Sequence, residues 1–148
     1  MEPMPGQPSD SLVAKRQRLE AALRPLEGQT RLAWLVEQSR QKPVLPATLK
    51  TDANRVEGCL AQLWLASEFR DGRCWFQADS DSQIVRAIAS LLCEFYSGET
   101  PAVIIAHDPG FLRELGITQH LTPNRRNGVA RVWDRIRAFA AAHATDKL

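Results

Sequence analysis

The stretch QLWLASEFRDGRCWFQA, residues 62–78, decides the fold class. Apolar and polar side chains alternate on both sides of Asp71-Gly72, which is the strongest short hairpin signal in the chain. We therefore predict two antiparallel strands that are joined by a tight turn, over Gln62–Phe69 and Arg73–Ala78.

The residues just before this hairpin extend the predicted sheet. Arg55-Val56-Glu57 favours a third, short strand, and Gly58–Ala61 then forms the turn that joins it to the hairpin. Cys59 lies at the tip of that turn. The sheet expected from the whole region is a small three-stranded antiparallel meander.

Apolar residues recur at helical spacing on both sides of the sheet. Prolines end the two helices before it, and Ser80 or Asp81 is expected to cap the first helix after it. Helices grouped before and after a small antiparallel sheet indicate an α+β fold, here with about six helices. They are expected over about 11–24, 29–41, 81–96, 102–106, 109–115 and 123–143, and the last one is expected to turn Arg126, Arg131, Asp134 and Arg137 toward water.

Length and composition limit the class of protein. A chain of 148 residues suits one domain; residues 1–10, with three prolines, predict a disordered lead-in, and 11–148 a single domain. A net charge of +2 argues against a nucleic-acid partner. No apolar run reaches the ~18 residues of a membrane span. With no secretory signal in the first residues, we expect a cytoplasmic protein.

The cysteines do not pair by spacing. Cys59, Cys74 and Cys93 lie 15 and 19 residues apart, which argues against a disulfide framework and against a zinc site. Cys74 and Cys93 fall inside a predicted strand and a predicted helix, so we expect them in the core. Cys59 follows a glycine in a turn, where it is either a reactive thiol or a small buried side chain.

Two polar clusters begin predicted helices. Asp79-Ser80-Asp81-Ser82 is explained by helix capping, with a binding carboxylate as the alternative. Arg125 and Arg126 lie in the first turn of the last helix, where they oppose its dipole. They either grip Asp79 or Asp81, offer charge to a partner, or form a solvated face. Gly128 in the same helix suggests close backbone packing.

Three blocks of this sequence resemble the SufE/CsdE family. Val56–Leu65 (VEGCLAQLWL) is similar to its V-x-G-C-x-S-x-V-W signature, and Phe76–Arg86 (FQADSDSQIVR) to its G-D-S-D-A-x-I-V-K/R-G segment. Gly116–Gly128 (GITQHLTPNRRNG) is similar to its L-x-x-H-L-T-P-S/N-R-x-N/Q-G block. Ala61 stands where the family often has serine, and Ala78 where it has glycine.

The resemblance implies a fold and a function. The fold would be the α+β fold of SufE and of NifU-type scaffold proteins. The thiol that matches Cys59 would accept sulfur from a cysteine desulfurase of the SufS/CsdA type, stimulate that enzyme, and pass the sulfur to a SufB-type iron–sulfur scaffold. Such a protein is a sulfurtransferase-type accessory protein that works by thiol–persulfide exchange. It needs no cofactor or metal of its own, because the pyridoxal phosphate belongs to the desulfurase.

The resemblance also implies roles for residues around Cys59. Asp81 and Arg125 match family residues tied to the active-site loop and to desulfurase contact. Glu57, Gln62 and Trp64 frame the loop, where they would contribute to docking or to the hollow that shelters the thiol.

Other functions remain to be weighed against a sulfur carrier. The main alternative is a binding module that activates a desulfurase allosterically while Cys59 only packs. A thiol hydrolase would need a base and an orienting group beside Cys59, and the sequence offers neither. A monomer and a homodimer are both compatible with the sequence.

Overall fold

The computed structural model describes residues 9–144 and has the predicted α+β architecture. Strands β1 (Leu63–Arg70) and β2 (Arg73–Ser80) form an antiparallel hairpin that is paired along its whole length. The two residues of its turn have positive φ angles, 54° at Asp71 and 77° at Gly72. A two-residue turn of this kind matches the twist of the strands. The predicted hairpin is confirmed.

The predicted third strand is wrong. Residues 55–57 make a single antiparallel bridge, in which Arg55 lies opposite Trp64, and so the sheet described by residues 9–144 has two strands. A turn over residues 51–55 precedes the bridge. After it, Gly58 adopts a φ of 85°, which turns the chain away from β1. The segment 55–57 is therefore too short to pair with β1 as a third strand.

Six α-helices surround the hairpin within the described residues, close to their predicted positions. The first helix after the sheet is capped by Ser82, whose side chain accepts a hydrogen bond from the Val85 N–H, and not by Ser80 or Asp81 as predicted. The helices are α1 (Asp10–Leu23), α2 (Gln29–Arg40), α3 (Gln83–Tyr96), α4 (Pro101–Ala106), α5 (Phe111–Glu114) and α6 (Pro123–Ala144).

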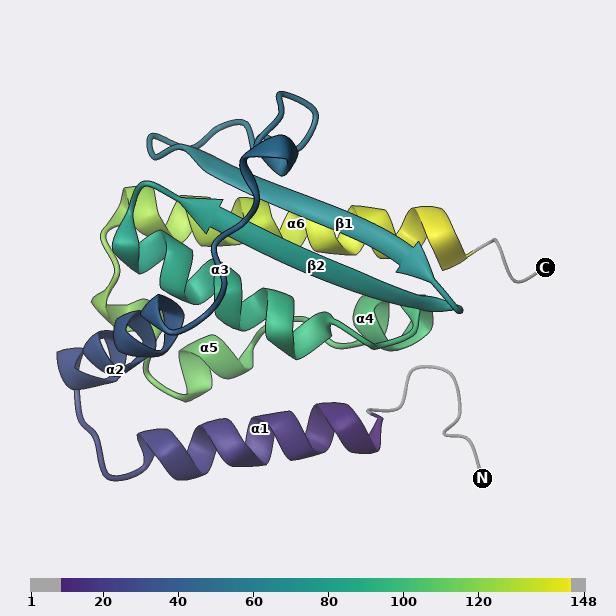
Figure 1. The fold of residues 1–148 in the computed structure, drawn as a ribbon. Coiled ribbons are helices and arrows are strands. Elements are labelled where there is room, and N and C mark those ends of the chain that lie inside the picture. Colours follow the sequence, from purple (N-terminus) through teal and green to yellow (C-terminus); the bar gives the residue numbers. More distant parts are fainter. Residues whose placement is uncertain (1–8, 145–148) are drawn as a thin grey trace.

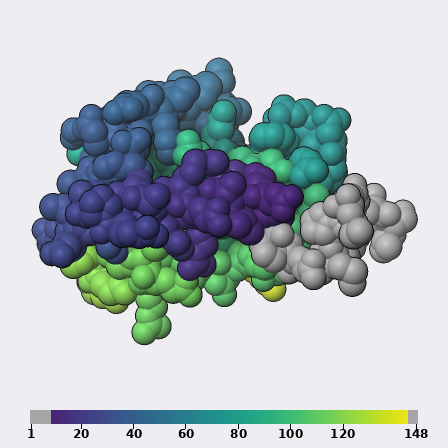
Figure 2. Space-filling view, turned by 90° about the horizontal axis from the view of Figure 1, so that it is seen from below, coloured from purple at the N-terminus to yellow at the C-terminus, as the bar shows by residue number. Residues whose placement is uncertain are grey.

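The hairpin and the helices form successive layers. Helices α3 and α6 pack against the hairpin, α2 packs on α3, and α1 lies on the far side of α3, at the bottom of Figure 1. Seen from that side, α1 lies across the front of the molecule (Figure 2). The hairpin, α3 and α6 contribute many of the fully buried side chains, among them Leu63, Leu65, Ile88, Leu92, Val132 and Ile136, and α1 and α4 add Leu23 and Ile104.

The segment before β1 is fixed to the outer face of the hairpin. The buried carboxylate of Asp79 forms salt bridges with Lys50 (3.0 Å) and with Arg86 on α3 (3.4 Å). The Lys50 ammonium also lies 5.4 Å from the centre of the Trp64 ring. These contacts determine where the chain approaches the turn that contains Cys59.

Helix α1 begins at Asp10, one residue inside the predicted lead-in, while residues 1–8 and 145–148 lie outside the described residues. Within residues 9–144, no helix is both long enough and apolar enough to span a membrane.

Candidate functional site

Cys59 lies in a loop, residues 57–62, that is held at both ends. Near its start, Asn127 of α6 donates from Nδ2 to the Gly58 carbonyl at 2.6 Å. At its end, the Gln62 N–H donates to a carboxylate oxygen of Asp81 at 2.9 Å, and the Asp81 N–H donates to the Gln62 carbonyl at 3.2 Å. We call residues 57–62 the Cys59 loop.

Helix α6 also fixes the segment that leads into this loop. The guanidinium of Arg135 donates to the carbonyls of Arg55 (2.9 Å) and Ala53 (3.1 Å). Two turns earlier on the same helix, Asn127 holds Gly58. One helix therefore positions the loop and the residues before it.

The Cys59 side chain is half-buried at a hollow of about 320 Å³. Gly128 forms part of its floor, because a Cβ atom built there would lie 3.7 Å from the Cys59 sulfur and 3.8 Å from the Val85 methyl groups. The predicted close packing at Gly128 does not require glycine, because a methyl group there would make ordinary van der Waals contacts. The loop, α3 and α6 line the hollow through Cys59, Leu60, Ala61, Ser82, Val85, Thr122, Asn124, Arg125 and Gly128.

Burial and one nearby cation act on the thiol in opposite directions. Partial burial raises the pKa of Cys59 above its ordinary value, and the positive charge of Arg131 lowers it by a smaller amount. The thiolate is the nucleophilic form of cysteine. In this arrangement Cys59 is mainly a protonated thiol at neutral pH. The residues that line the hollow cover part of its side chain.

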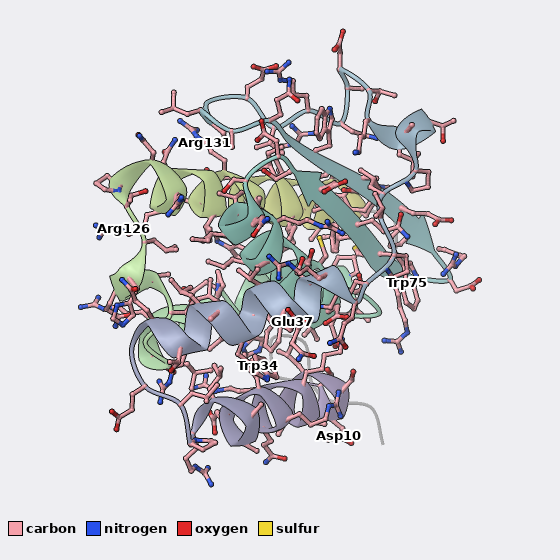
Figure 3. The ribbon with its side chains drawn as sticks, turned by 60° about the vertical axis from the view of Figure 1, so that its left-hand side comes forward. Asp10, Trp34, Glu37, Trp75, Arg126 and Arg131 are labelled. Carbon is pink, nitrogen blue, oxygen red and sulfur yellow. The ribbon has the colours of Figure 1, made fainter. Side chains whose placement is uncertain are left out.

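A larger cavity, of about 600 Å³, lies elsewhere, between α1, α2 and α3. Trp34 points toward α1 from α2 on this side of the molecule (Figure 3). None of the residues lining this cavity is a cysteine or a histidine. Of these two depressions, only the smaller hollow is lined by a cysteine, although it is not the larger of the two.

The structure brings some of the predicted site residues to Cys59 and separates others from it. Arg125 lines the hollow, and Asp81 holds the end of the loop. Gln62 takes part through its backbone. Glu57 is exposed outside the hollow, and Trp64 lies on the outer face of β1 beneath Lys50.

The predicted grip of an arginine on Asp79 or Asp81 is wrong. Asp79 pairs with Lys50 and Arg86, and the Asp81 carboxylate accepts the backbone N–H of Gln62. Neither Arg125 nor Arg126 forms a salt bridge with another described residue. Their positive charge is free for a partner or for solvent.

Three residues of α6 that the sequence did not assign to the site contact the loop region: Asn127, Arg131 and Arg135. Arg131 is exposed, as expected, and its guanidinium also lies against Gly58. It projects from α6 toward the loop before β1, whereas Arg126 points away at the start of the helix (Figure 3). The spacing of four between residues 127, 131 and 135 places them on one side of a helix, and this was the available signal.

The other cysteines lie where they were expected. Cys74 and Cys93 are buried in the core, and burial raises the pKa of Cys93 to about 12. Across residues 9–144, no group of three or more His, Cys, Asp and Glu side chains is arranged to hold a metal ion.

A solved structure supports the fold. The solution structure of a hypothetical protein from Thermus thermophilus matches 88% of this chain and 96% of its own, with a TM-score of 0.72 and 24% sequence identity.

Sequence comparison identifies the family. An uncharacterized SufE-like protein of Synechocystis sp. is 34% identical over 93 residues, which span 63% of this chain and 58% of the relative. SufE-like protein 1 of Arabidopsis thaliana, named as chloroplastic/mitochondrial, is 32% identical over 125 residues, 83% of this chain and 34% of the relative. The family model SufE, described as an Fe-S metabolism associated domain, matches residues 17–140. The chain belongs to the SufE family.

Proposed function

We propose that this protein accepts sulfur from a cysteine desulfurase on Cys59, stimulates that enzyme, and passes the sulfur to an iron–sulfur scaffold. The observation that carries the proposal is the position of Cys59 on a loop at the edge of a hollow, in a chain of the SufE family. The role needs a nucleophilic sulfur, a path for the donor, and shelter for the product.

The proposed transfer is a thiol–persulfide exchange. The Cys59 thiolate attacks the outer sulfur of the donor persulfide R–S–SH. A new S–S bond forms to Cys59, the original S–S bond breaks, and the donor cysteine leaves as the thiolate R–S⁻. The product Cys59–S–SH then passes its proton to that thiolate. No electron is gained or lost overall, so the reaction needs no oxidant or reductant.

The geometry suits a carrier whose thiol is unreactive until a partner binds. Burial keeps the pKa of Cys59 raised, so few thiolates are present at rest. The loop is fixed by a small number of hydrogen bonds, from Asn127 and Asp81. A partner that releases them would expose the sulfur and restore its ordinary acidity.

The proposal assigns the remaining chemistry to the partners. Pyridoxal phosphate would be bound by a desulfurase of the SufS/CsdA type, and the acceptor would be a SufB-type scaffold. The protein would act as an accessory protein in the cytoplasm. Leu60, next to the thiol, is 83% exposed and is available as an apolar contact for such a partner.

The test is the intact mass of the protein after incubation with a cysteine desulfurase, pyridoxal phosphate and L-cysteine, without reductant. We expect a gain of about one sulfur atom, or a multiple of it, that maps to Cys59 and disappears in Cys59→Ser. Cys93→Ala is the matched control, since that thiol is buried and should not affect uptake.

The outcomes separate the two candidate roles. If no sulfur is gained while desulfurase turnover still rises, the protein is an allosteric binding module and Cys59 only packs. If neither sulfur uptake nor stimulation occurs with any desulfurase tried, both roles are rejected.

A further inference from the structure

Helix α6 presents two residues, one turn apart, to two successive residues of the Cys59 loop. Gly128 faces the Cys59 sulfur. Arg131 faces Gly58: its Nε lies 3.1 Å, and its Cζ and Nη2 each 3.5 Å, from the position that a Cβ on Gly58 would occupy. The guanidinium thus fills the space that a side chain at residue 58 would take, directly beside the reacting residue.

The guanidinium of Arg131 has no acidic partner among the described residues. It forms none of the salt bridges and side-chain hydrogen bonds found there, whereas Arg135, one turn later, is occupied by two carbonyls. A cation without an anion at such a position is free to interact with negative charge that appears only during the reaction.

The other charged groups around the loop do not take this role. Glu57 is exposed on the loop itself and is negative. The Asp81 carboxylate, between β2 and α3, is held by the Gln62 N–H. Arg125 of α6 lines the hollow, but Arg131 is the group whose charge lowers the pKa of Cys59.

We propose that Arg131 is the positioning cation of the sulfur transfer: it holds the negative charge of the Cys59 thiolate during attack and then that of the persulfide. This inference rests on the proposed function. In the exchange, negative charge is present on Cys59 before the new S–S bond forms. It returns to the terminal sulfur when the product loses its proton. The Arg131 guanidinium beside the loop stabilises both the thiolate and the deprotonated persulfide.

Gly58 allows Arg131 to take this position. Its φ of 85° favours glycine, and its bare Cα lets the guanidinium approach the backbone next to Cys59. Arg131 projects toward this loop, while Arg126 points away from it (Figure 3). Arg126 is therefore a matched control of equal charge on the same helix.

The experiment measures how fast iodoacetamide alkylates Cys59 between pH 6 and pH 11, with the modified peptide quantified by mass spectrometry. Wild type is compared with Arg131→Gln, Arg131→Lys and Arg126→Gln. We expect Arg131→Gln to raise the midpoint of the pH profile by about half to one pH unit. This corresponds to an alkylation rate about 3- to 10-fold lower at pH 7.5, with the same plateau at high pH. Arg131→Lys should restore most of the rate, and Arg126→Gln should match wild type.

Added salt gives a second readout. Because Arg131 is exposed, sodium chloride should screen its charge and raise the midpoint in wild type but not in Arg131→Gln. Thermal denaturation of each variant verifies that the fold is kept.

An unchanged midpoint in Arg131→Gln would overturn the proposal. So would a changed plateau at a constant midpoint, because that result would mean that Arg131 only packs against Gly58. Alkylation requires no desulfurase, so this failure is distinct from a failure of the proposed function, which would appear as absent sulfur uptake in wild type.

Discussion

Replacing Gly128 with alanine should stabilise the protein and at the same time weaken its protection of bound sulfur. Gly128 is buried in the second turn of α6, and its φ is not among the positive ones. An added methyl group would lie 3.7 Å from the Cys59 sulfur and 3.8 Å from the Val85 methyl groups, which is ordinary van der Waals contact. Gly-to-Ala replacement within a helix contributes about 1 kcal/mol. We expect the free energy of unfolding to rise by about that amount and Tm by about 2–4 °C.

The same methyl group occupies the floor of the hollow. The second sulfur of a persulfide is bonded about 2.05 Å from the Cys59 sulfur and needs this space. With alanine at residue 128, we expect the persulfide to lie further out and to be reduced several times faster by dithiothreitol.

Two measurements test this reasoning: urea denaturation of the thiol form, and the lifetime of the persulfide by intact mass. Ala130→Gly, at an exposed position two residues further along α6, is the control, and it should destabilise by about 1 kcal/mol without shortening the lifetime. A Gly128→Ala protein that is less stable than wild type would refute the packing argument. An unchanged persulfide lifetime would show that the second sulfur does not use the hollow.

Asn127→Ala removes the hydrogen bond to the Gly58 carbonyl, so Cys59 should be alkylated faster and stability should fall by about 1 kcal/mol. Asn124→Ala, on the same helix but without a bond to the loop, should change neither. Ile136→Ala, at a fully buried position of α6, should cost about 2–5 kcal/mol in urea denaturation. Burial raises the pKa of Cys93 to about 12, so the unfolded chain loses that proton first as the pH rises above about 9; stability should fall between pH 9 and 12, less steeply in Cys93→Ala.

The fold could be predicted from the sequence wherever local signals agreed with the packing. Asp71-Gly72 sets the hairpin, and both residues have the positive φ that such a turn requires. The helices could be placed because their apolar stripes are local features, although the cap of α3 is Ser82, next to the predicted Ser80 or Asp81. The third strand could not, because its end depends on the conformation of Gly58 and on the turn before Arg55, and an alternating pattern does not reveal either.

The site could be predicted only in part, for a similar reason. Cys59, Asp81 and Arg125 could be predicted because their sequence blocks could be recognised one by one, and the structure places Cys59 and Arg125 at the hollow and Asp81 at the end of the loop. The roles of Asn127, Arg131 and Arg135 depend on how α6 crosses the Cys59 loop, which is a tertiary contact between segments about 70 to 80 residues apart. The spacing of these three residues in the sequence predicts only that they lie on the same side of α6.

The two fixed ends of the Cys59 loop limit how far the Cys59 sulfur can move. At one end of the loop, the Val56 N–H donates a hydrogen bond to the Leu63 carbonyl. At the other end, the Gln62 N–H donates to the Asp81 carboxylate. Cys59 is three residues from Val56 and three from Gln62. Three residues of extended chain span about 10 Å. While both ends of the loop stay hydrogen-bonded, the backbone of Cys59 remains within about 10 Å of each anchoring residue. In the proposed transfer, a donor enzyme would therefore have to bring its sulfur close to the surface of this protein, and a close fit between the two surfaces would be a condition of the reaction.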